Sequence, residues 1–211
     1  MTRFTTPAEL EAAIIKLIAI EPRFGPVHHT HGTPSLRAAP ATLETLLVII
    51  TEQFLSLKAA AAIWARLKDG IGEVTAENVL AVPLEKLVQL GLSRSKAKCF
   101  HACATAGFDF DGLMRQDLSE IRKALLSIWG IGPWTADIFL LSAASHADAW
   151  PAGDVALQAA AQHLFSFRKR PDVKRMEKIA SKWRPYRAAA ARLLWAHYRH
   201  IRAMPQAPSQ N

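Results

Sequence analysis

Residues 125–137 read Leu125-Leu-Ser-Ile-Trp-Gly130-Ile-Gly132-Pro-Trp134-Thr-Ala-Asp137. Two glycines enclose one apolar residue, between an amphipathic segment that begins at Leu118 and a second segment that begins at Pro133. Glycine is favoured just after a helix and proline at the first position of one. The stretch therefore predicts a helix, a hairpin and a helix over about residues 118–144, with Ile131 anchoring the hairpin tip in the core.

The two hairpin glycines suit a phosphate contact. Glycine reaches backbone angles that other residues avoid, and its missing side chain lets a phosphate approach the backbone. The amides at the start of the second helix, with the helix dipole behind them, favour an anion. We therefore expect Gly130 and Gly132 to bind DNA, although this pattern alone also occurs in ordinary helix–helix turns.

The rest of the sequence predicts an all-α protein. Alanine is abundant, apolar residues recur at helical spacing and no segment reads as a strand. We expect an irregular connection at 21–40 and a frayed tail at 205–211. The expected helices span residues 7–20, 42–67 with a break near 55–56, 75–81, 83–89, 93–106, 118–129, 133–144, 155–167 and 187–203.

Length and charge narrow the function classes. A chain of 211 residues with 50% apolar residues and a net charge of +8 fits two small helical lobes that share a cleft and a polyanionic partner. No apolar run is long enough for a membrane span and the N-terminus lacks the pattern of a secretion signal, so we expect a cytoplasmic protein, nucleoid-associated in bacteria or nuclear in eukaryotes. A phosphate-tracking face is predicted in the basic C-terminal quarter, from Arg168, Lys169, Arg170, Lys174, Arg175, Arg184, Arg187, Arg192, Arg199 and Arg202.

Several ordered motifs resemble the helix-hairpin-helix (HhH-GPD) superfamily of DNA glycosylases. The hairpin is followed by Trp150-Pro-Ala-Gly-Asp154-Val-Ala-Leu-Gln158, and in that family an aspartate lies twenty residues beyond the hairpin's Trp or Lys. Trp134 and Asp154 have this separation. Residues 50–60 and 90–97 resemble two further blocks of the family, while residues 183–187 and Trp195 resemble the C-terminal helix of the bacterial 3-methyladenine glycosylase II branch. The similarity covers roughly residues 21–199.

The resemblance implies a fold and an activity. It implies one glycosylase domain over residues 1–211, in which a base pocket and a DNA-binding cleft lie between two helical lobes. It also implies a monofunctional base excision repair enzyme that hydrolyses the N-glycosidic bond of alkylated bases, of the 3-methyladenine and 7-methylguanine type, flipped out of duplex DNA. The expected partner is damaged double-stranded DNA, and we expect a monomer that does not bind membranes.

Asp154 is the expected catalytic carboxylate. Breaking an N-glycosidic bond builds positive charge on the sugar, which a nearby carboxylate stabilises while it orients or deprotonates water. An aspartate after glycine is also favoured as a helix N-cap. The two roles are compatible, because a capped aspartate has a fixed orientation.

Aromatic residues are the expected walls of the base pocket. We predict that Trp134, Trp195 and Tyr186 bind the flipped base, since an indole face attracts a cationic alkylated purine. Trp134 also occupies the position where lyase members of the family carry a nucleophilic lysine, so no lyase step is expected. Of the other tryptophans, Trp64 and Trp129 are predicted to lie in the core, and Trp150 fits either role.

The family resemblance places the residues that fill the gap left by the flipped base at Gln53 and Phe54. We expect Phe54 to be the wedge and Gln53 to contact the opposite strand, although Phe54 also fits an apolar core stripe that runs from Leu46 to Trp64. Thr135 is a further expected DNA contact. Residues 93–98 fit a phosphate site or a solvated helix start.

No cofactor or metal site is expected on side chains. His28, His29 and His31 lie in the predicted loop without a second cluster of ligands, and Cys99 and Cys103 read as buried apolar residues. Two cysteines exclude the family's four-cysteine iron–sulfur cluster. The resemblance does imply a monovalent cation on the backbone carbonyls of the hairpin.

Two other functions remain open from the sequence. The enzyme could act on another lesion, such as a deaminated or mismatched base, because pocket walls rather than the scaffold select the substrate. Alternatively, the hairpin could serve a non-catalytic DNA-binding protein. A carboxylate at position 154 favours the enzyme, since binding alone would not require it.

Overall fold

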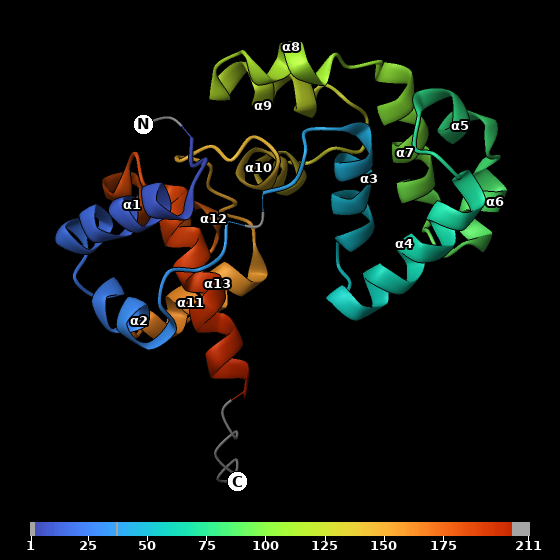
Figure 1. The fold of residues 1–211 in the computed structure, drawn as a ribbon. Helices are drawn as coiled ribbons and strands as arrows, with labels where there is room; N and C mark the ends of the chain where they lie inside the picture. Colours follow the sequence, from blue (N-terminus) through green and yellow to red (C-terminus); the bar gives the residue numbers. More distant parts are fainter. Residues whose placement is uncertain (1–2, 37, 204–211) are drawn as a thin grey trace, which may run out of the picture. The chain divides into compact units, whose positions relative to one another are not determined.

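The structure, a computed structural model, describes residues 3–36 and 38–203 (Figure 1). Within them the secondary structure is helical, apart from one isolated bridge between Arg3 and His146. The chain forms two compact units, Ala38–Ala144 and a second unit made of Met1–Arg37 and Ser145–Asn211. The predicted all-α class with two helical lobes is confirmed, and the predicted tail at 205–211 lies outside the described residues.

The unit Ala38–Ala144 contains the hairpin. Its helices are α3 (Leu43–Glu52), α4 (Leu57–Ile71), α5 (Ala76–Ala81), α6 (Leu84–Gln89), α7 (Arg94–Ala106), α8 (Phe110–Met114), α9 (Leu118–Leu126) and α10 (Pro133–Ser142). Helix α7 packs against α3, α5 and α6, and Ala97 and Phe100 are fully buried there. Thr42, Ser56, Thr75 and Ser93 each cap a helix by accepting a backbone amide, which is why these helices begin where they do.

The other unit carries Asp154. It comprises α1 (Pro7–Ile20), α2 (Phe24–His31), α11 (Val155–Leu164), α12 (Val173–Ala180), a short 3-10 helix (Ser181–Trp183) and α13 (Arg187–Ala203). Helix α13 packs on α1, α2 and α11, and the fully buried run Ala188–Ala191 lets these helices approach closely. Trp183 is fully buried and makes edge-to-face contacts with Phe24 and Trp150.

The predicted irregular connection at 21–40 is wrong in its first half, because α2 forms there. Pro26 lies in the first turn of α2, where a missing amide hydrogen costs no helical hydrogen bond. Gly32 ends α2 with a φ of 64°, a conformation that favours glycine. The prolines and glycine that indicated a loop therefore mark the two ends of a short helix.

The apolar stripe predicted from Leu46 to Trp64 is interrupted. The break near residue 55 is confirmed, since α3 ends at Glu52 and α4 starts at Leu57. Phe54 lies between the two helices and Leu57 begins α4, and both side chains are exposed, whereas Leu46 and Ile50 of α3 are buried.

Among the described residues, no helix combines the length and apolar character needed to span a membrane.

Candidate active site

Of the two glycines in the hairpin turn, Gly130 is the one that the backbone conformation requires. Gly130 has a φ of 87°, and a Cβ there would lie 2.8 Å from the Cys99 Sγ atom of α7. Ile131 is buried, and its amide donates to the Ile128 carbonyl at 3.1 Å. The predicted anchoring of the hairpin tip by Ile131 is thus confirmed, with Gly130 allowing close packing on α7.

Gly132 has a different environment. Its φ of −94° is available to any residue, and a Cβ there would meet no atom within 4 Å. Gly132 is the N-cap of α10 and supplies no capping side chain. Open space beside an uncapped helix start is the surrounding that a phosphate oxygen needs.

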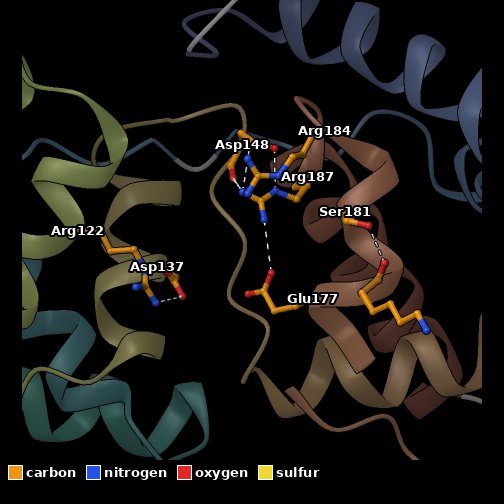
Figure 2. Close-up of polar contacts among 8 residues, drawn as sticks. Arg122, Asp137, Asp148, Glu177, Ser181, Arg184 and Arg187 are labelled. Carbon is orange, nitrogen blue, oxygen red and sulfur yellow. Dashed lines mark hydrogen bonds and ion pairs between the residues drawn. The ribbon is translucent and has the colours of Figure 1, made fainter. Parts of the chain in front are cut away.

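An ion pair joins the two hairpin helices. Arg122 of α9 donates from Nε to the Asp137 Oδ1 atom of α10 at 2.7 Å (Figure 2). Asp137 is mostly buried, so its charge requires this partner. Asp137 had no predicted role, although a lone carboxylate in the apolar helix Pro133–Ser142 is a signal for a buried pair.

The tryptophans of the hairpin do not form its core. The predicted core position of Trp129 is wrong, because 55% of its surface is exposed. Helix α9 ends at Leu126, so Trp129 lies in the turn rather than on the inner face of the helix, and Ile128 and Ile131 are buried instead. Trp64, also predicted to be core, is only half-buried, as is Trp134.

Asp154 is fixed by two hydrogen bonds in the unit that contains it. It is the N-cap of α11, and its Oδ1 atom accepts the Leu157 amide at 2.9 Å and the Trp195 indole N–H at 3.2 Å. Only 9% of the residue is exposed. Gln158 donates to the Ala152 carbonyl at 3.0 Å, which fixes the loop before Asp154. The N-cap role is observed, and it orients the carboxylate that we predict to be catalytic.

The loop that leads to Asp154 is bound to the start of α13. Arg187 donates to both carboxylate oxygens of Asp148, at 2.8 and 2.9 Å, and to the Asp148 carbonyl at 2.9 Å (Figure 2). Arg184 and Glu177 flank this pair, and the Ala188 amide donates to the Ala147 carbonyl at 3.0 Å. Trp150, which fitted either role, is buried beside Trp183.

Two arginines of the predicted phosphate-tracking face have other roles. Arg187 and Arg192 are buried, and Arg192 donates to the Leu36 and Ala188 carbonyls. Their assignment to that face is therefore wrong, because a side chain without access to solvent cannot track a DNA backbone. The exposed members are Arg168, Lys169, Arg170, Lys174, Arg175, Arg184, Arg199 and Arg202.

Of the predicted pocket residues, Trp195 contacts Asp154 through its indole N–H. It lies half-buried on α13. Tyr186 is also half-buried, just before α13, and its amide donates to the Trp183 carbonyl at 2.7 Å. Its role in base binding stays a prediction.

The predicted wedge segment joins α3 to α4. The Phe54 side chain is fully exposed and its φ is 58°. The Gln53 side-chain amide donates to the Thr135 hydroxyl of α10, which is buried. Gln53 thus contacts the second hairpin helix in this structure, and its contact with DNA stays a prediction. Thr135 itself is almost fully buried, and its contact with DNA stays a prediction.

The block at 93–98 contributes to the same connection. Ser93 caps α7, and Lys96 donates from Nζ to the Thr51 carbonyl at 2.9 Å and to the Gln53 carbonyl at 2.7 Å. Lys96 therefore binds the end of α3. Arg94 and Lys98 are the other basic residues of this block, and the predicted phosphate site rests on them.

The described histidines and cysteines form no arrangement of three or more ligands that suits a metal ion. His28 lies on α2 rather than in a loop. Its Nε2 atom is 3.3 Å from the Glu11 Oε2 atom and 3.2 Å from the Thr33 hydroxyl oxygen. Cys99 and Cys103 are buried free thiols in α7, as predicted.

Comparison with known proteins gives a consistent result. A family model described as "HhH-GPD superfamily base excision DNA repair protein" matches residues 47–185. The alkylbase DNA glycosidase-like protein of Schizosaccharomyces pombe is 26% identical over 172 residues, which are 77% of this chain and 80% of that protein. A DNA-3-methyladenine glycosidase structure from Bacillus halodurans aligns over 90% of both chains, with a TM-score of 0.76 and 27% identity. The 3-methyladenine DNA glycosylase of S. pombe, solved with abasic DNA, gives a TM-score of 0.78 at 27% identity, over 87% of this chain and 95% of that one.

Proposed function

Since the chain belongs to the HhH-GPD superfamily of base excision DNA repair proteins, we propose that it is a monofunctional DNA glycosylase that releases alkylated bases from double-stranded DNA. The relatives named for alkylbase or 3-methyladenine excision support this substrate class. We expect the protein to act where the DNA lies, at the bacterial nucleoid or in the eukaryotic nucleus.

The proposal rests on the burial and the hydrogen bonds of Asp154. A largely buried carboxylate is oriented by a backbone amide and an indole N–H, at the twenty-residue separation from Trp134 that the family motif predicts. Preorganised groups of this kind need no rearrangement when charge develops in the transition state.

In the proposed reaction the bond between the base nitrogen and C1′ breaks, and its electron pair leaves with the base. The Asp154 carboxylate stabilises the positive charge that develops on the sugar. Water then adds to C1′ and gives up one proton, with Asp154 orienting the water or accepting the proton. The products are a free base and an abasic site.

An alkylated purine suits this chemistry. Its positive charge makes it a good leaving group, so the site needs no strong general acid. The charge also favours contact with an electron-rich indole face, and we propose that Trp195, which contacts Asp154, supplies one.

We propose that backbone carbonyls of the hairpin turn bind the monovalent cation expected from the family. Backbone carbonyls such as that of Ile128 are neutral, hard oxygen donors. A cation bound there would add positive charge beside a DNA phosphate. The chemical step itself uses Asp154 and water.

The proposal is tested by incubating the protein with duplexes that carry 3-methyladenine, 7-methylguanine, hypoxanthine or uracil and identifying the free base. We expect release of the methylated purines. Release of hypoxanthine or uracil alone would replace the substrate class, and no release from any duplex would favour a DNA-binding role.

Borohydride treatment during the reaction tests the monofunctional assignment. Trp134 has no amine that could form a Schiff base, so no covalent complex with DNA is expected. Efficient trapping would show that another group acts as a lyase nucleophile.

A further inference from the structure

The connection between α3 and α4 exposes the large apolar side chain of Phe54 in an unfavourable backbone conformation. Phe54 is fully exposed, and its φ of 58° lies in the left-handed region. A non-glycine residue in that region is disfavoured, because its Cβ comes too close to the following carbonyl oxygen. Contacts elsewhere must therefore hold this conformation.

Lys96 of α7 provides the first of these contacts. At the end of α3, the Ile50 carbonyl accepts the Gln53 amide at 3.3 Å and the Glu52 carbonyl accepts the Leu55 amide at 3.2 Å. The Lys96 ammonium binds the two alternate carbonyls, those of Thr51 and Gln53. The negative end of the helix dipole also stabilises a cation at this point.

The Lys96 ammonium is drawn away from water by this arrangement. Burial lowers the pKa of Lys96, which measures the cost of desolvating its charge. An exposed lysine would avoid that cost, so the two carbonyls are the contacts that retain the charge at this position.

The Gln53 side chain provides the second contact. It donates to the hydroxyl of Thr135, which is buried in the first turn of α10. The residue immediately before Phe54 is therefore held from α7 through its carbonyl and from α10 through its side chain. Ser56 then caps α4 by accepting the Ala59 amide at 3.2 Å, which fixes the chain after the turn.

We propose that Lys96 is a positioning residue that, with the Gln53–Thr135 hydrogen bond, holds Phe54 ready to insert between base pairs when a base is flipped. This inference rests on the proposed glycosylase function. An exposed phenyl ring is poorly hydrated, whereas insertion between base steps removes it from water and fills the gap beside the extruded nucleotide. A rigid turn avoids the cost of ordering the ring during that step.

The proposal is tested with Lys96→Met, Lys96→Arg, Phe54→Ala and the Lys96→Met/Phe54→Ala double variant. Two quantities are measured, single-turnover base release from a 3-methyladenine duplex and the fluorescence of 2-aminopurine placed beside the lesion, which rises when the stack opens. Because the ring no longer offsets the cost of unstacking, we expect Phe54→Ala and Lys96→Met each to lower both signals about tenfold or more. Lys96→Arg keeps a cation and should recover most of the loss.

The double variant separates positioning from general stabilisation. If Lys96 acts through Phe54, the double variant is no slower than Phe54→Ala alone. Multiplied losses, or an unchanged Lys96→Met protein, would overturn the proposal. Should Lys96→Met fail to fold, Gln53→Leu removes the second contact and is tested in the same cycle, with the same two outcomes.

The fluorescence readout keeps the two proposals distinct. It requires only DNA binding and base unstacking, so it reports on Lys96 and Phe54 even if the wild-type protein releases no base. Normal stack opening without base release would contradict the glycosylase assignment alone. Base release with a stack opening that does not depend on Lys96 would contradict the positioning role alone.

Discussion

The Asp154 Oδ1 atom accepts a hydrogen bond from the indole Nε1 of Trp195 at 3.2 Å, across 41 positions of sequence. The same oxygen caps α11 through the Leu157 amide. The proposed catalytic carboxylate and one proposed pocket residue thus form a connected pair within one compact unit.

Trp195→Phe tests this pair. The substitution keeps an aromatic ring and removes the indole N–H, and a hydrogen bond to a charged group contributes about 1.5–3 kcal/mol. We expect base release to slow by roughly tenfold or more, with little change in DNA affinity. Trp129→Phe is the matched control, since Trp129 is an exposed tryptophan of the other unit. Equal rates for the two variants would show that the indole N–H does not assist Asp154.

The two hairpin glycines should respond differently to alanine. Gly130→Ala places a methyl group 2.8 Å from the Cys99 Sγ atom on a backbone with φ of 87°, so thermal or denaturant unfolding should show a loss of roughly 1–3 kcal/mol. Gly132→Ala meets no neighbour and should fold normally, while its methyl group weakens binding to duplex DNA. Unchanged DNA affinity for a folded Gly132→Ala protein would contradict the phosphate contact.

Asp148→Ala should destabilise the protein. The change leaves the buried Arg187 without its bidentate partner, and breaking a buried ion pair costs about 3–5 kcal/mol. Glu177→Gln is the control, because Glu177 is half-exposed and lies 3.6 Å from Arg187, a geometry that contributes about 1 kcal/mol or less. Urea unfolding that ranks the two variants equally would contradict the structural role of Asp148.

Stability should fall in mild acid because of His197. Its pKa is lowered to about 4 by burial and by the neighbouring charges of His163, His31 and His200. Since the unfolded value is near 6.5, the unfolded chain binds more protons between these limits. The free energy of unfolding therefore decreases as the pH falls from about 6.5 towards 4. Melting temperatures at pH 7, 6 and 5 should show a smaller decrease for His197→Gln than for the wild type or for the exposed control His29→Gln.

Much of the fold follows from local sequence signals. Helices Pro7–Ile20 and Arg187–Ala203 have their predicted bounds, and the hairpin lies where Gly130, Gly132 and Pro133 indicated. Capping residues and glycine stops act over a few residues, so they can be identified without tertiary information. The comparisons confirm the family that these motifs predicted.

Features that depend on tertiary contacts were missed. The exposure of Trp129 contradicts its predicted core position, because Trp129 lies beyond the end of α9, where helical periodicity no longer applies. Phe54 lies beyond the end of α3 in the same way, which removes it from the core stripe and leaves its wedge role a prediction. The Arg187–Asp148 pair joins residues 39 positions apart, and the Lys96 contact with Gln53 spans 43. No local pattern indicates which of many arginines and lysines is buried.

The predicted single domain over residues 1–211 and the catalytic role of Asp154 stay predictions. The hydrogen bonds of Asp154 do supply the fixed orientation that such a role needs.

Asp154→Asn provides the most direct test of the central claim. Asparagine keeps the size and an oxygen that can cap α11, but it removes the negative charge that would stabilise the sugar cation. In a single-turnover assay on a 3-methyladenine duplex, we expect binding to be retained and base release to fall by about a hundredfold or more. Release at the wild-type rate by a folded Asp154→Asn protein would contradict the assignment of Asp154 as the catalytic carboxylate.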